Sequence, residues 1–209
     1  GGRDVVLVPS AIASAIGVGL PVQEPVGSMV IDIGGGRTEV AVISLGGMVV
    51  RKSIPVAGDA MEDAIVQWLL QEQQITIGER TANKLKLRIG SAAGVNKPTH
   101  LRIRGRDLAG GSPKELTLNT NHIAQAMHPV IEIIQKVVAD VLSRTPPELS
   151  ADIMNRGIML CGGGSKLIGM DLVLRQATGL PVLTVENPGQ ATVNGASQLL
   201  ANLTLYERV

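Results

Sequence analysis

The chain has 209 residues, 44% of them hydrophobic, so it is long and apolar enough to bury a core. Lys and Arg number 19 against 18 Asp and Glu, and aromatic residues make up 1%. This composition argues against nucleic-acid binding, which relies on basic surfaces and aromatic stacking. The single cysteine excludes a disulfide within the chain and fits a reducing cytoplasm.

An apolar run near the start, Val5–Leu20, superficially resembles a signal peptide. Asp4, the interruption by Pro9 and a single preceding positive charge argue against that interpretation. We expect instead a short buried strand over Val5–Val8 and a small-residue helix over Ser10–Ile16, capped by its first serine. No run is long and apolar enough to span a bilayer, which predicts a cytoplasmic chain without a transmembrane segment.

A glycine-rich hairpin follows. The strand Met29–Ile33 leads into three glycines, and a second β-branched run, Thr38–Ile43, begins at once. Because glycine lacks a Cβ, several N–H groups can converge there on one anion such as a phosphate. Asp32, at the end of the first strand, is positioned to hold a hydrated Mg²⁺. An ordinary glycine turn is the alternative. The three glycines are Gly34, Gly35 and Gly36.

The next segments predict a meander and a helix. A third strand, Met48–Ile54, follows a Gly-Gly turn. Apolar residues at helical spacing then predict a helix that Asp59 caps, with Glu62 as capping-box partner. Trp68 on this helix is interpreted as a core residue.

The composition changes near residue 75, which predicts a small inserted α+β lobe over 75–118. It contains a helix over Thr81–Ile89 and two strands, Leu101–Arg104 and Glu115–Leu118, joined by a loop rich in Gly and Pro. We expect residues 1–74 and 119–209 to form the core lobe.

A long helix capped by Thr120 is predicted from Asn121 to Leu142, with a kink or break at Pro129. His122 lies on it, and we interpret this histidine as solvated because no metal-ligand spacing surrounds it. Thr145-Pro146-Pro147 ends this helix, and a short one follows over Glu148–Met154.

A second glycine triplet follows the strand Gly157–Cys161. Ser165 then starts a helix predicted to reach Thr178, so free N–H groups and a helix dipole coincide at a site suited to a phosphate or a purine. A tight strand-to-helix connection is the alternative. Neither triplet belongs to a Walker or Rossmann motif. We predict that both triplets face one cleft and bind a single purine nucleotide; the second comprises Gly162, Gly163 and Gly164.

The sequence resembles the MreB family, the bacterial actin homologues that polymerise and guide rod-shaped growth. The resemblance is carried in order by residues 27–47, 78–86, 104–108, 145–157 and 162–167. It covers the C-terminal half of that family, subdomains IIA and IIB. It implies an α/β, actin-like ATPase (ribonuclease H-like) fold with a mixed sheet flanked by helices. The core lobe would be subdomain IIA and the inserted lobe subdomain IIB.

The resemblance also implies a site for ATP and Mg²⁺. Residues 32–38 match the second phosphate loop, with Asp32 near the metal, and residues 162–165 match the adenosine motif. The helix over 83–86 matches a wall of the adenosine pocket. The family usually has Thr at position 37 and an acidic residue at position 83. The implied nucleotide-binding residues are Gly34, Gly35, Gly36, Arg37, Thr38, Asn83, Lys86, Gly162, Gly163, Gly164 and Ser165.

The implied function is a nucleotide-binding cytoskeletal subunit that assembles head to tail, or with a full-length relative, through contacts of the inserted lobe. Such a protein helps determine rod shape with the cell-elongation machinery at the membrane, which this chain would reach through other segments or partners. No catalytic residue is assigned: Pro9 and Ser10 stand where the family has its water-positioning Glu, and the first phosphate loop lies outside the match. The alternatives are a degenerate, non-hydrolysing partner and a phosphotransferase of the same superfold.

Overall fold

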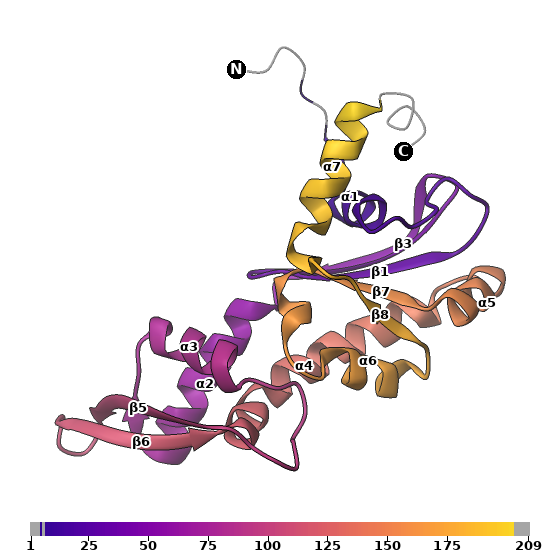
Figure 1. Cartoon of the computed structure of the whole chain (residues 1–209). Helices are drawn as coiled ribbons and strands as arrows, with labels where there is room; N and C mark the ends of the chain where they lie inside the picture. Colours follow the sequence, from indigo (N-terminus) through magenta and orange to yellow (C-terminus); the bar gives the residue numbers. More distant parts are fainter. Residues whose placement is uncertain (1–4, 6, 203–209) are drawn as a thin grey trace.

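The computed structural model describes residues 5 and 7–202 (Figure 1). Its larger sheet has five strands in the order β3-β2-β1-β7-β8. The first three strands of the chain pair antiparallel as a meander, whereas β7 and β8 extend the sheet in parallel from β1. This arrangement confirms the predicted mixed sheet. The strands are β1 (Ser28–Ile33), β2 (Thr38–Ser44), β3 (Gly47–Ile54), β7 (Ile158–Cys161) and β8 (Val182–Thr184).

Helices cover both faces of this sheet (Figure 1). Alternate residues of the central strands point to opposite faces, so Val30 packs with α1 and α7 while Ile31 packs with α2 and α4. Burial on both faces explains why β1 and β2 are almost continuously apolar. The four helices are α1 (Ser10–Gly17), α7 (Ala191–Ala201), α2 (Gly58–Gln73) and α4 (Thr120–Ser143).

Helices α1 and α7 cross in backbone contact. A Cβ on Gly17 would stand 1.9 Å from the Ala191 carbonyl oxygen, and one on Gly195 would stand 1.7 Å from that of Ala13. Only glycine fits at both positions, so the crossing fixes these two helices closely against each other.

A second sheet of three strands, in the order β4-β5-β6, lies in the predicted inserted lobe beside α3 (Figure 1). The Gly- and Pro-rich loop prediction was wrong at Gly105, which pairs with Lys114 inside the hairpin. A Cβ on Gly105 would stand 2.8 Å from the Thr76 carbonyl oxygen, so this glycine lets β4 approach. The elements are β4 (Ile75–Thr76), α3 (Glu79–Ile89), β5 (His100–Asp107) and β6 (Pro113–Asn119).

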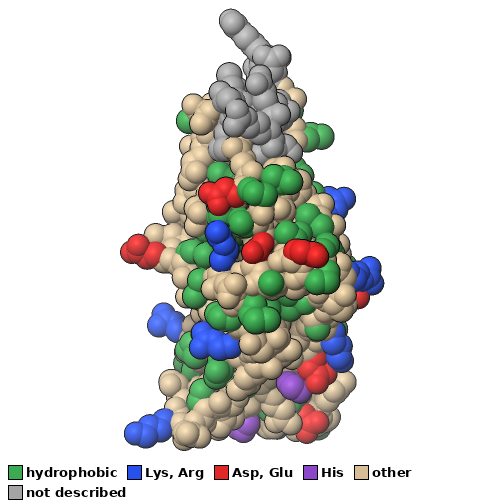
Figure 2. All heavy atoms as spheres, turned by 90° about the vertical axis from the view of Figure 1, so that its right-hand side faces the viewer, with side chains coloured by type: hydrophobic (Ala, Val, Ile, Leu, Met, Phe, Trp, Pro, Cys, Tyr) green, Lys and Arg blue, Asp and Glu red, His purple; other side chains and the backbone are tan. Residues whose placement is uncertain are grey.

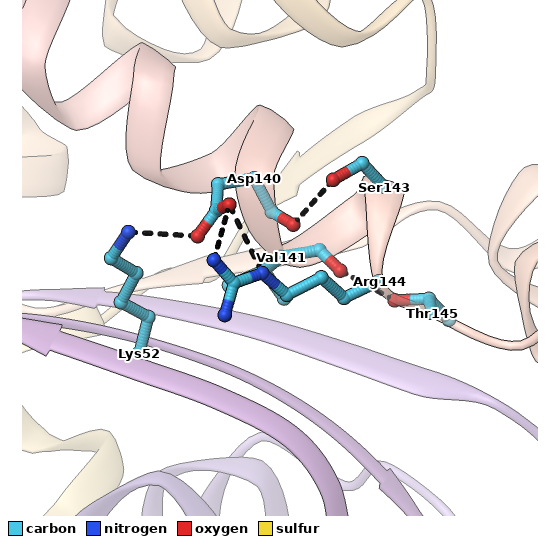
Figure 3. A network of polar contacts seen from close by, with 6 residues as sticks. All are labelled: Lys52, Asp140, Val141, Ser143, Arg144 and Thr145. Atoms are coloured by element: carbon cyan, nitrogen blue, oxygen red, sulfur yellow. Dashed lines mark hydrogen bonds and ion pairs between the residues drawn. The ribbon is translucent and has the colours of Figure 1, made fainter.

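A polar network fastens edge strand β3 to α4 (Figure 3). Lys52 donates to Asp140 over 2.7 Å, and the Arg144 guanidinium contacts the other carboxylate oxygen at 2.9 Å. These two cations hold the pKa of Asp140 below its ordinary value, although partial desolvation opposes them. A lysine on an edge strand also discourages pairing with another chain.

The helix starts differ from the predicted caps. Helices α1 and α2 begin without a side-chain cap, and Ser10 donates instead to Glu39. The cap of α4 is Asn119 rather than Thr120, in a reciprocal capping box with His122. His122 is half-buried and its ring lies 5.7 Å from that of Trp68, so its assignment to the solvated surface was wrong.

Two further predictions concern segments near proline residues. Val5 and Leu7 are 83% and 93% exposed and form no strand, because neither sheet edge in the described part of the chain pairs with them. Val6, within that predicted strand, lies outside the described residues. Helix α4 continues through Pro129, which contradicts a break there and leaves the kink as the prediction. Helix α5 (Pro147–Arg156) starts with proline in its first turn.

The surface mixes charges of both signs with scattered apolar side chains, as the face in Figure 2 shows. Among the described residues, none of the helices has the length and apolarity needed to cross a membrane.

Candidate functional site

A cavity of about 550 Å³ opens between the ends of β1 and β7 and helices α2 and α3. Its volume is typical of small-molecule sites. Glycines from both triplets line it, together with side chains from the two helices and the segment after β7. The lining residues are Gly34, Gly35, Gly58, Asp59, Met61, Glu62, Asn83, Lys86, Leu87, Gly90, Gly163, Gly164, Lys166, Leu167 and Ile168.

The first triplet forms a tight loop between β1 and β2, in which Gly34 donates its N–H to the Arg37 carbonyl. The start of α2 anchors this loop, since the N–H groups of Gly58 and Asp59 donate to the carbonyls of Gly34 and Gly35 over 3.2 and 2.8 Å. In a trans peptide the N–H points opposite to the carbonyl. The amides of Gly35 and Gly36 therefore point together away from α2, as a pair of donors for an anion.

Each glycine of the second triplet has its own role. Gly162 has φ +83°, and a Cβ on it would stand 2.3 Å from the Ile33 carbonyl oxygen. A Cβ on Gly164 would stand 2.4 Å from Ile33 Cγ2, whereas the space beside Gly163 is open. The two triplets therefore touch through Ile33, and Gly163 faces the cavity.

The helix predicted over Ser165–Thr178 ends as expected but begins five residues later, at Met170. A single 3₁₀ turn, η1 (Gly163–Lys166), begins within the triplet, and α6 (Met170–Thr178) starts only after Gly169 adopts φ +76°. Between them Ile168 bridges to Ser91, which ties this segment to the end of α3. A second 3₁₀ turn, η2 (Pro188–Gln190), precedes α7. The helix-dipole argument for the second triplet was therefore wrong.

Glu62 organises the wall formed by α2 and α3. Its carboxylate accepts from Lys86 over 2.5 Å and from Asn83 over 2.7 Å, and Lys86 also donates to the Gly58 carbonyl over 3.1 Å. Desolvation raises the pKa of Glu62, but the contacts with Lys86 and Asn83 outweigh it and leave the pKa lowered. The predicted capping-box role of Glu62 was wrong because its side chain turns to α3.

Replacing Lys86 by Met leaves this carboxylate without its cation, and we expect a loss of about 2 kcal/mol in the free energy of unfolding at neutral pH. Because the folded pKa of Glu62 is lowered, its stabilising contribution is present above about pH 4.5 and disappears as the pH falls. The difference between the wild type and K86M should therefore shrink in acid. Urea unfolding across this range measures it. K84M, at an exposed position of the same helix, is the control, and an equal loss in K84M would contradict the role of Glu62.

Some of the predicted site residues line the cavity and the others do not. Those that line the cavity are Gly34, Gly35, Asn83, Lys86, Gly163 and Gly164. Gly36 and Arg37 are exposed in the loop outside the cavity wall, so the guanidinium does not line the cavity. The buried hydroxyls of Thr38 and Ser165 serve the backbone, donating to the carbonyls of Val56 and Gly162 over 2.7 and 2.6 Å. Gly162 does not line the cavity and packs instead against Ile33 and Asp32.

Sequence reasoning missed several lining residues. Leu87 and Ile168, 72% and 64% exposed, offer apolar surface at the cavity suited to a flat aromatic ring, and Lys166 adds a cation. The signal available in the sequence was weak, since Ile168 is an apolar residue shortly after the second glycine triplet and Leu87 follows Lys86 on the predicted helix. Their meeting depends on the bridge between Ser91 and Ile168, which no local pattern indicates.

Asp32 lies on the α1 side of the sheet rather than in the cavity wall. Its Oδ2 accepts from Ser14 and Thr192, and its Oδ1 lies 2.4 Å from the position a Cβ on Gly162 would take. The described residues contain no cluster of three or more metal-ligating side chains. Mg²⁺ nevertheless fits here, because it keeps several waters and needs one carboxylate beside a phosphate. A phosphate on the nearby amides would otherwise be repelled by Asp32.

Cys161 is a packed thiol. Burial and the adjacent Asp32 carboxylate raise its pKa to about 12, so it stays protonated at neutral pH. A buried, protonated thiol suits a core residue rather than a nucleophile.

The sequence model of the family described as "MreB/Mbl protein" matches residues 1–208. The chain belongs to the MreB/Mbl family. It is 42% identical over 206 residues to the cell shape-determining protein MreB of Escherichia coli K12, covering 99% of this chain and 59% of that protein. It is 39% identical over 203 residues to the cell shape-determining protein Mbl of Bacillus subtilis 168, covering 97% and 61%. The chain thus spans about three fifths of these MreB/Mbl relatives.

Solved structures agree with this family. The crystal structure of MreB5 of Spiroplasma citri bound to ADP aligns with a TM-score of 0.94 at 33% identity, covering 99% of this chain and 63% of that one. The same protein bound to AMPPNP aligns equally well. A MamK double helical filament aligns with a TM-score of 0.70 at 19% identity, covering 93% and 59%, and shows the fold alone. The fold of this MreB/Mbl chain is therefore actin-like, as predicted.

Proposed function

We propose that this chain provides one side of the nucleotide site of an actin-like filament protein that helps determine cell shape. The observation that carries the proposal is the meeting of the two glycine triplets at one cavity with Lys86 and Lys166. The apolar side chains of Leu87 and Ile168 suit a purine, and Asn83 and Lys86 offer polar contacts to a ribose. The free amides of Gly35 and Gly36 suit phosphate oxygens.

The site favours ATP or ADP with Mg²⁺. Asp32 would hold the hydrated ion, which supplies positive charge beside the phosphates. The Spiroplasma citri relative was solved with ADP and with AMPPNP, and this supports the same ligand class here.

The expected result of calorimetry is saturable binding of ADP and ATP in the presence of Mg²⁺ by the 209-residue chain. Adenosine should bind more weakly because it lacks the phosphates that the loop amides accept. No heat of binding with either nucleotide would contradict the proposal and favour the degenerate partner instead.

For the filament role, we propose head-to-tail assembly of copies, or of this chain with a full-length relative, with contacts from residues 75–118. Such a heterologous contact propagates rather than closing. Nucleotide-dependent pelleting and filaments in electron micrographs are the expected results. Equal pelleting with and without nucleotide, together with an absence of filaments in the micrographs, would contradict this role. Phosphotransfer to common sugars would instead favour the kinase alternative.

A further inference from the structure

Asp32 is held by two hydroxyl groups from helices far apart in the sequence. Ser14 of α1 donates to Asp32 Oδ2 over 2.6 Å, and Thr192 of α7 donates to the same oxygen over 3.1 Å. The two hydroxyl oxygens lie 2.8 Å from each other, so the three groups form a closed triangle. Ser14 is 0% exposed, which shields its contact with Asp32 from competing water.

The helices hold these hydroxyls in place. Helices α1 and α7 meet in backbone contact at Gly17 and Gly195, which lie about one helical turn after Ser14 and Thr192. The crossing therefore holds in place the backbone positions from which the two hydroxyls reach Asp32. The carboxylate has one oxygen fixed on the helix side, while Oδ1 lies against Gly162 of the second triplet.

Two protons serve the three contacts of the triangle, because each hydroxyl carries one. An ionised carboxylate oxygen accepts both, and hydrogen bonds to a charged group are stronger than those between neutral groups. The hydroxyls thus leave Oδ1 as the oxygen available to a ligand. This oxygen lies on the side of the sheet toward which the free amides of Gly35 and Gly36 point.

We propose that Ser14 and Thr192 are positioning residues that orient Asp32 toward the hydrated Mg²⁺ of a bound nucleotide. The inference rests on the proposed nucleotide site and adds two residues that no motif indicates. Residues that orient a metal ligand contribute about 10- to 100-fold to metal affinity in other proteins.

The test compares ADP binding with Mg²⁺ and with EDTA, by calorimetry on the 209-residue chain. In the wild type, Mg²⁺ should tighten binding. In the variant S14A/T192V this gain should fall by about 10-fold or more, while binding in EDTA stays unchanged. T192S keeps the hydroxyl at position 192, so this variant, with Ser14 unchanged, should keep the increase in ADP affinity that Mg²⁺ produces. S143A is the control, because the exposed Ser143 hydroxyl bonds within α4 rather than to Asp32.

The outcomes separate the two proposals. Equal Mg²⁺ gains in the wild type and S14A/T192V would overturn the positioning role and leave the nucleotide site intact. An equal loss of ADP affinity with Mg²⁺ and with EDTA would also overturn it, because such a loss indicates a merely structural role. Circular dichroism and thermal unfolding show whether S14A/T192V is folded. If it is misfolded, the Mg²⁺ gain of the single variant T192V is compared with that of T192S, and equal gains would overturn the positioning role. A wild type that binds no ADP would overturn both proposals.

Discussion

Replacing Gly162 by Ala should lower the free energy of unfolding by about 3 kcal/mol and weaken nucleotide binding. Gly162 has φ +83°, a conformation that costs other residues free energy. The added Cβ would also stand 2.3 Å from the Ile33 carbonyl oxygen and 2.4 Å from Asp32 Oδ1. The two triplets would have to separate to relieve these contacts. Urea unfolding and calorimetry with ADP measure both effects.

Gly163→Ala is the matched control, because the space at its Cβ position is open and its φ lies outside the left-handed region. It should fold with nearly wild-type stability. Equal stability of the two alanine variants would contradict direct packing between the triplets.

Gly163→Glu should abolish nucleotide binding while the fold persists. The side chain enters open space at the cavity rather than neighbouring backbone, so the protein accommodates it. It occupies ligand volume and adds a negative charge where the site should accept phosphate or purine, and like-charge contacts cost several kcal/mol. We expect at least about a 100-fold weaker affinity for ADP by calorimetry.

Gly78→Glu controls for the added charge. Gly78 also has open space at its Cβ position, precedes α3 and does not line the cavity. It should bind ADP as the wild type does. A comparable loss in G78E, or wild-type affinity in G163E, would place the nucleotide elsewhere.

Apolar periodicity and glycine placement were sufficient to predict most of the strands and helices, whereas the resemblance to the MreB family supplied the mixed sheet and the actin-like fold. The apolar runs on either side of Asp32 and the glycines between them predicted the hairpin, and a further apolar run predicted the strand before Gly162. The parallel pairing of that strand with β1 is a finding of the structure. The apolar runs and glycines are local signals, since strand period and glycine turns act over a few residues. They also led to the prediction that Gly35 and Gly163 face one cavity, which the structure confirms.

The failures arise from long-range contacts. Glu62 looked like a capping residue, but a cation 24 residues away competes for it. Ser165 looked like a helix start, but Gly169 and the bridge from Ile168 to Ser91 redirect the chain. Ser14 carried no signal, because its partner Thr192 lies 178 residues away. Tertiary structure overrides local propensity at such positions.

The central claim is that both glycine triplets contact one nucleotide. Nuclear magnetic resonance of the chain labelled with ¹⁵N-glycine tests it most directly, because 25 glycines report on the whole fold. Titration with ADP and Mg²⁺ should shift the amide signals of Gly35, Gly36, Gly163 and Gly164 together, with one affinity, and leave Gly78 and Gly189 in place. Shifts confined to one triplet, or spread over glycines remote from the cavity, would contradict the account.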